Sequence, residues 1–213
     1  MKRFWPISAL WLIAALGCGP QKQADPPAVE IKAVNGLRPA GAFASIEDPR
    51  ARASALFSEA AQVFQHPRCA NCHPADSRPR QGDDSRVHEP PIAGGDDGRG
   101  VPALTCRSCH QLANYDLVGM PGAPDWHLAP ASMQFLDTTA AAICGRIKDP
   151  KSNGGKTLEQ VIDHIGHDAL VTWGWAPGAL RKPAPGDRTT LIGLMRAWVD
   201  AGAHCPPVTK DSL

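Results

Sequence analysis

The pattern Cys-x-x-Cys-His occurs twice in this chain and places the strongest limit on how the chain can fold. The first copy is CANCH, Cys69–His73, and the second is CRSCH, Cys106–His110. Two thiols at positions i and i+3 of a turn lie on one side of it, with the next imidazole beside them. Such a group can hold a metal ion, act as a thiol redox pair, or attach a haem covalently.

The N-terminus has the pattern of a bacterial export signal. Residues 1–17 join a short basic start to an apolar run, Phe4–Leu16, which is too short to span a bilayer comfortably. The stretch Ala-Leu-Gly-Cys18 resembles the lipobox of bacterial lipoproteins, although Ala15 replaces the usual leucine. This resemblance implies that Cys18 is acylated and becomes the first mature residue. Two alternatives are a soluble periplasmic protein cleaved nearby and, less favoured, a buried N-terminal helix.

The remaining chain divides by composition into a tether and a domain. Residues 18–44 are rich in Pro, Gly and polar side chains and are predicted to be a flexible tether. Residues 45–213 are predicted to form the folded domain. The chain has 22 basic and 21 acidic residues, and loss of Lys2 and Arg3 with residues 1–17 leaves 20 against 21. This balance gives no electrostatic footprint for binding nucleic acid.

Four segments have the periodicity of helices. In each, apolar side chains recur every three or four residues and form one face. His66-Pro67 and Asp149-Pro150 end two of them, because the residue before a proline is pushed out of the helical conformation. Thr157 and Gln160 make a capping-box sequence at the start of another. The predicted helices span residues 49–65, 138–148, 158–170 and 188–201.

The rest of the chain is expected to be loops. The 213 residues include 21 prolines and 20 glycines, no convincing strand alternation is found, and residues 74–104 form a long polar stretch between the two motifs. The expected fold class is therefore mainly α with extensive loops. A chain with so little regular structure usually depends on disulfides, metals or large cofactors for its order.

Export and spacing favour haem attachment over the other uses of the motifs. The pairs of a zinc ribbon are commonly about 15–20 residues apart, whereas 33 residues separate Cys72 from Cys106. A thioredoxin-like pair follows a strand, whereas a helix is expected before Cys69. Thioethers to the two thiols and a proximal histidine describe a c-type haem. Two covalent haem c groups are predicted, bound by Cys69, Cys72, His73, Cys106, Cys109 and His110.

Several stretches resemble a family of exported cytochrome c-like proteins: HPRCANCHP, CRSCHQ, WHLAPASM, NGGKT and WGWAPG. Members are often labelled isoquinoline 1-oxidoreductase subunit. The resemblance implies a small di-haem c-type cytochrome of the bacterial periplasm, with an architecture organised around its two haems. The label implies electron transfer from a molybdenum hydroxylase. Because the chain has no motif for molybdopterin or an iron–sulfur cluster, the implied role is that of an electron-accepting accessory.

The sixth ligand of each iron decides between electron transfer and catalysis, because a His or Met there leaves no room for a substrate. Met133 lies in a proline-containing loop after the second motif, with His127 six residues earlier. His164 and His167 lie about one helical turn apart. The candidate distal ligands are Met133, His127, His88, His164, His167 and His66.

Cys144 and Cys205 remain after the haem cysteines and Cys18. Spare thiols in an oxidising compartment usually pair, so a Cys144–Cys205 disulfide is predicted, the alternative being two free buried thiols.

The sequence as a whole favours an exported di-haem electron carrier, periplasmic and either soluble or anchored by a lipid. Its expected partner is a redox protein, such as a periplasmic or membrane dehydrogenase or hydroxylase. Two alternatives stay open, a small peroxidase-like haem enzyme and a haem-based sensor, each with one open iron position.

Overall fold

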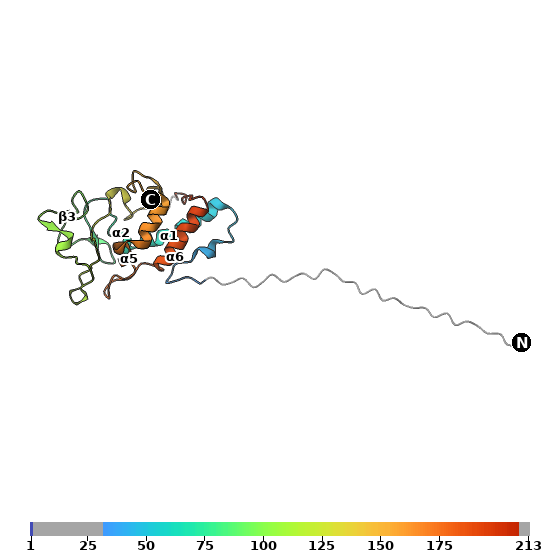
Figure 1. The fold of residues 1–213 in the computed structure, drawn as a ribbon, viewed down its shortest axis with the longest axis horizontal. Helices are drawn as coiled ribbons and strands as arrows, with labels where there is room; N and C mark the ends of the chain where they lie inside the picture. The colour runs from blue at the N-terminus through green and yellow to red at the C-terminus, as the bar shows by residue number, and fades with distance from the viewer. Residues whose placement is uncertain (2–31, 209–213) are drawn as a thin grey trace. The chain divides into compact units, whose positions relative to one another are not determined.

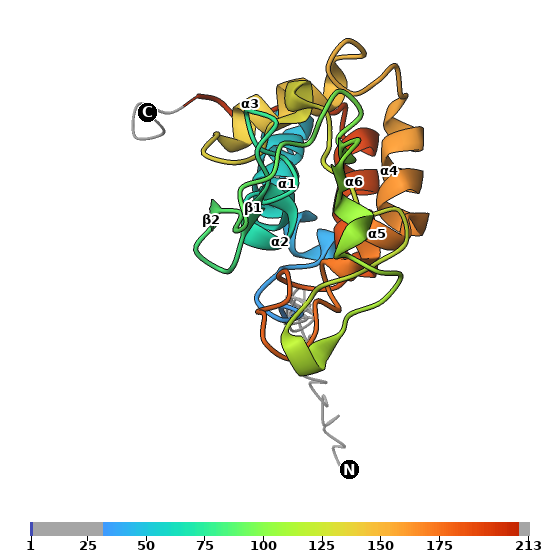
Figure 2. The same cartoon turned by 90° about the vertical axis from the view of Figure 1, so that its left-hand side faces the viewer.

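Two long helices, α1 (Pro49–Phe64) and α6 (Arg188–Asp200), pack side by side at the centre of the helical region (Figures 1 and 2). The computed structural model describes Met1 and residues 32–208. Helix α3 (Ala140–Lys148) packs on α1, and α4 (Leu158–His167) packs on α6. The described part of the chain is thus mainly helical, as the sequence predicts.

Side-chain caps fix where the helices begin. In each case an Asp or Thr oxygen accepts a hydrogen bond from a backbone N–H of the first turn, which has no partner within the helix. Thr157 and Gln160 form the predicted capping box in α4. The capping residues are Asp48 for α1, Thr139 for α3, Thr157 for α4 and Asp187 for α6.

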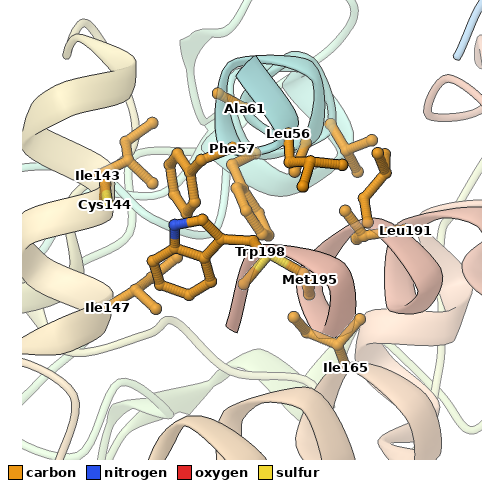
Figure 3. Packing of buried hydrophobic residues seen from close by; sticks show 14 of the residues in the cluster. Leu56, Phe57, Ala61, Ile143, Cys144, Ile147, Ile165, Leu191, Met195 and Trp198 are labelled. Atoms are coloured by element: carbon orange, nitrogen blue, oxygen red, sulfur yellow. The ribbon is translucent and has the colours of Figure 1, made fainter. Parts of the chain in front are cut away.

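Trp198 of α6 lies at the centre of the core (Figure 3). Its side chain is fully buried, its ring lies 5.0 Å from that of Phe57 on α1, and its indole N–H donates to the carbonyl of His204. Ile143 and Ile147 of α3 approach the same ring. The buried indole therefore joins three helices and satisfies its only polar atom.

The predicted helix at 158–170 is in fact two helices. Helix α4 ends at His167, and a new short helix, α5 (Ala169–Trp173), begins at once. The side chain of Asp168 accepts hydrogen bonds from the N–H groups of Leu170 and Val171. Asp168 therefore caps a new helix where the apolar periodicity suggested one continuous helix.

The loop region between the motifs contains short strands that the sequence analysis did not predict. Strands β1 (Arg80–Gln81) and β2 (Arg86–Val87) pair antiparallel, with Arg80 opposite Val87. Strands β3 (Gly100–Val101) and β4 (Leu104–Thr105) pair likewise, with Gly100 opposite Thr105. Two-residue strands with mostly exposed side chains leave no alternation to detect. The remaining elements are α2 (Pro67–Ala70), η1 (Ala40–Phe43), η2 (Cys106–Ser108), η3 (Asp116–Val118) and η4 (Ala131–Met133).

The prediction that residues 18–44 form a flexible tether is wrong for residues 32–44. Leu37 and Phe43 are buried in the core, and Arg38 pairs with the buried Glu59 of α1. The segment is anchored because its apolar side chains fill space beside α1 and α6. Most of the predicted export signal at 1–17, the lipidation site Cys18 and tether residues 18–31 lie outside the described residues.

The predicted disulfide is confirmed: Cys144 of α3 is bonded to Cys205, which follows α6. Lys148 adds a hydrogen bond to the carbonyl of Ala203 in the same connection. The C-terminal segment is thus fastened to α3. Across residues 32–208, no helix combines the length and apolar character that crossing a membrane requires.

Replacing Leu37 with alanine tests whether this segment belongs to the core. Leu37→Ala is expected to lower the free energy of unfolding by about 2–5 kcal/mol, because the vacated space is enclosed. Leu117→Ala removes the same atoms from an exposed side chain and is expected to change it by less than about 0.5 kcal/mol. Denaturant titration of both variants measures the difference, and equal effects would mean that residues 32–44 are a tether after all.

The double variant Cys144→Ser/Cys205→Ser tests the disulfide. Its loss is expected to lower the free energy of unfolding by about 2–5 kcal/mol, because the unfolded chain gains freedom in a long loop. Thermal unfolding with and without a reductant measures the effect. The reductant should destabilise the parent protein and leave the double variant unchanged.

Candidate functional site

The end of α1 leads directly into the first motif. His66 and Pro67 break the chain after α1, and the short helix α2 starts at Pro67. The backbone N–H groups of Cys72 and His73 then continue the turn with hydrogen bonds to Cys69 and Ala70. A single tight turn therefore carries both thiols and the imidazole, as attachment of one group at three points requires.

The His73 imidazole is fixed from two sides. Its Nδ1 lies 2.7 Å from the carbonyl oxygen of Met133, and its ring stacks on Phe135 at 3.9 Å. Because a carbonyl oxygen can only accept, Nδ1 carries the proton and Nε2 keeps a free lone pair. Burial lowers the pKa of His73 to about 4. The imidazole is therefore neutral at neutral pH, the state in which histidine binds a metal.

The second motif has the same arrangement, but other residues hold its histidine in place. Its cysteines lie at and after η2, and the N–H of His110 donates to the carbonyl of Cys106. The Nδ1 of His110 lies 2.8 Å from the carbonyl of Pro121, and its ring stacks on Trp126 at 4.5 Å. Both motif histidines thus donate Nδ1–H to a backbone carbonyl, which is the usual outer support of a metal-bound histidine.

Each motif lines its own cavity. The first cavity, of about 260 Å³, is bordered by Cys69, Cys72 and His73. The second cavity, of about 510 Å³, is bordered by Cys106, Cys109 and His110. The two cavities share a wall, whose members are Arg68, Cys72, His127 and Trp173. Two large bound groups in these cavities would therefore be near neighbours.

The first thiol pair is poorly suited to redox exchange. Burial raises the pKa of Cys69 to about 12 and that of Cys72 to about 11, whereas reactive redox cysteines have lowered pKa values. A helix precedes this pair, where a thioredoxin-like motif has a strand.

The motif cysteines also do not form one zinc site. Between residues 32 and 208, no group of three or more Cys, His, Asp or Glu side chains comes close enough to hold a metal ion. A zinc ribbon needs four ligands around one ion. The described residues therefore offer no single zinc site made from the two motifs.

The second cavity and the shared wall fit an anionic group such as a haem propionate. Arg68 is almost wholly buried and pairs with Asp83, but its Nε atom has no hydrogen-bond partner. Arg80, Arg86 and Arg181 line the same cavity. A buried guanidinium donor without a partner is costly, and a carboxylate in the cavity would satisfy it. The cationic residues that border the second cavity thus fit the carboxylates of a haem.

Four of the six predicted distal ligands line a cavity. His164 and Met133 lie at the first cavity, His88 at the second, and His127 in the shared wall. The Nδ1 of His164 lies 3.5 Å from Asp168. The backbone carbonyl of Met133 binds the Nδ1 side of His73. A sixth ligand has to approach from the other face of the bound group, which disfavours Met133 in that role.

The structure does not bring the other two predicted ligands to a cavity. The Nδ1 of His66 accepts the N–H of Arg68 and caps α2, so its proton lies on Nε2, which cannot then bind a metal. His167 is 79% exposed and pairs with Asp163. Neither residue lines the first or the second cavity. The structure therefore gives no support to His66 or His167 as iron ligands.

Several supporting groups were missed by the sequence analysis. Phe135 and the carbonyls of Met133 and Pro121 hold the two imidazoles, and Asn114 binds both the Trp173 indole and the N–H of Gly122. A carbonyl acceptor has no residue-type signal, because every residue has one. The only sequence signal for the support of the two imidazoles was the presence of aromatic residues near the motifs.

Replacing Gly122 with alanine tests the support of His110. A Cβ at this position would overlap the carbonyl oxygens of Gln111 and Ala113, and crowding of this kind costs about 1–3 kcal/mol. Gly145→Ala in α3 is the control, because no atom lies within 4 Å of its Cβ position, and it is expected to be neutral or stabilising by up to about 1 kcal/mol. Thermal unfolding compares the two, and a neutral Gly122→Ala would contradict the tight support of Pro121.

No protein-family model matches this chain, and neither the curated proteins nor the solved structures contain a match to it. A function is therefore inferred from the motifs and from the geometry of the two cavities.

Proposed function

We propose that this protein is an exported electron carrier with two covalently bound c-type haems. Cys69 and Cys72 would hold one haem with His73 as the proximal ligand. Cys106, Cys109 and His110 would hold the other in the same roles. When bound, each haem iron supplies a site that takes up and releases one electron.

The observation that carries the proposal is the pair of neighbouring cavities with equivalent supports. In both, two thiols border the cavity beside a histidine whose Nδ1 is bound to a carbonyl. The support leaves each Nε2 free as a metal ligand. The shared wall, with Trp173 as a member, keeps the two sites close, which is what electron passage between them needs.

The surface near the second motif supports a protein partner. Leu112, Tyr115, Leu117 and Val118 are all exposed, and a Cβ on Gly119 would lie 3.1 Å from the exposed Leu180. Contiguous patches of exposed apolar side chains are typical of interaction sites. We infer that a redox protein docks here, such as a periplasmic or membrane dehydrogenase or hydroxylase. With its signal at residues 1–17 the carrier would be periplasmic, and acylation of Cys18 would tether it to a membrane.

The decisive experiment counts the haems. The full chain is exported from a bacterium that attaches haem c, and the intact mass of the mature protein is measured. The mass of the chain plus two haems is expected, together with the mass of a lipid if Cys18 is acylated. The variants Cys69→Ser/Cys72→Ser and Cys106→Ser/Cys109→Ser should each lose one haem.

The disulfide variant Cys144→Ser/Cys205→Ser is the matched control, because it also removes two thiols but should keep both haems. A mature parent protein with no haem, or with a zinc ion instead, would overturn the proposal. Two low-spin haems that ignore hydrogen peroxide support a carrier, whereas turnover of peroxide would favour the peroxidase-like alternative.

A further inference from the structure

Two histidine rings lie close together at the second cavity. The rings of His88 and His110 lie 5.9 Å apart between centres and are inclined at 71°, and both residues line the cavity. Metal–imidazole bonds are about 2.0 Å long, so two imidazoles on opposite sides of one metal ion have ring centres roughly 6 Å apart. The observed spacing is therefore that of a bis-histidine metal site.

Both histidines use Nδ1 to donate a hydrogen bond to a backbone carbonyl. The Nδ1 of His88 lies 2.9 Å from the carbonyl of Pro90, and that of His110 lies 2.8 Å from the carbonyl of Pro121. A carbonyl can only accept, so each Nδ1 donates, which leaves Nε2 as the nitrogen that can bind a metal. Neither Nε2 has a hydrogen-bond partner among the described residues. Both histidines thus have the tautomer and the support of metal ligands.

The chain holds His88 in place through the β1–β2 hairpin. The N–H of His88 donates to the carbonyl of Pro79, just before β1. Arg68 of α2 donates to the carbonyl of Gly82 and pairs with Asp83 at the hairpin turn. The N–H of Arg80 donates to the carbonyl of Asn71. His88 therefore rests on a hairpin that is fastened to the first haem-binding motif.

Other possible ligands at the second cavity are less well placed. Met120 directly precedes Pro121, whose carbonyl holds the Nδ1 side of His110, so its backbone lies on the proximal side. His127 lies in the wall shared with the first cavity. The aromatic rings in contact with His110 are those of Trp126 and His88.

We propose that His88 is the sixth ligand of the iron at the second site. This inference rests on the proposed function, because it needs a haem bound at Cys106 and Cys109. It makes the second iron a closed, six-coordinate bis-histidine centre, which transfers electrons and does not bind a substrate. It also gives the long segment between the motifs a function, because this segment places His88 beside the haem of the second motif.

The test compares His88→Ala with the parent in the exported, haem-loaded full-length protein. Electron paramagnetic resonance of the ferric form and carbon monoxide titration of the ferrous form are measured. His88→Ala is expected to gain one high-spin haem and to bind one more carbon monoxide per molecule than the parent. Added imidazole should restore the low-spin signal, because it fills the vacated position.

His167→Ala is the matched control, because it removes a histidine that is 79% exposed and borders neither cavity, and it should leave the spin state of both haems unchanged. His88→Met should remain six-coordinate with a higher potential, since methionine ligation raises it. Near-infrared magnetic circular dichroism of the parent gives an independent reading, in which the second haem should show bis-histidine ligation.

The outcomes separate the two proposals. A parent protein without haem at Cys106 and Cys109, seen by mass, would refute the proposed function. Two haems in His88→Ala that both stay low-spin and bind no additional carbon monoxide would refute His88 as the ligand while the proposed function stands. If His88→Ala does not fold, the parent spectrum decides, and a histidine–methionine signature at the second haem would overturn the inference.

Discussion

A row of touching aromatic rings connects the core of this protein to its first site. Trp198 packs on Phe57, Phe57 on Phe64, Phe64 on Phe135, and Phe135 on His73, with centre-to-centre distances of 5.0, 6.0, 5.4 and 3.9 Å. Packed aromatic rings have few alternative arrangements in a dense interior. The packing of α1 on α6 therefore supports the His73 imidazole through Phe135, in addition to its hydrogen bond to the Met133 carbonyl.

The second site is built in a different way. His110 stacks on Trp126, and Trp126 meets Trp173 edge to face at 4.9 Å, but the surrounding chain is mostly loop and exposed at the surface. Order here comes from hydrogen bonds to backbone carbonyls and from Arg68, which reaches across from α2. In the proposed carrier, a haem bound here would add to the packing of this region of short strands and 3₁₀ turns.

The sequence predicted what depends on residue type and missed what depends on tertiary contact. Apolar periodicity located the four main helices, and two unpaired cysteines predicted the disulfide between Cys144 and Cys205. The break at Asp168 was missed, because an aspartate in a helical pattern gives no sign of whether it caps a new helix. Leu37 was assigned to a tether because its neighbours are polar, although its burial depends on α1 and α6. The role of His66 as the cap of α2 could be seen only once its hydrogen bond to Arg68 was known.

Arg68 connects the two sites structurally, because it borders both cavities. Its side chain lies in the wall between the cavities, holds the hairpin that carries His88, and lies 5.7 Å from the ring of Trp173. A displacement of α2 would thus move the first motif and the hairpin together. In the proposed carrier, the reduction potential of each haem depends on burial and nearby charge. Because one buried arginine borders both sites, a change in its surroundings would act on both potentials at once.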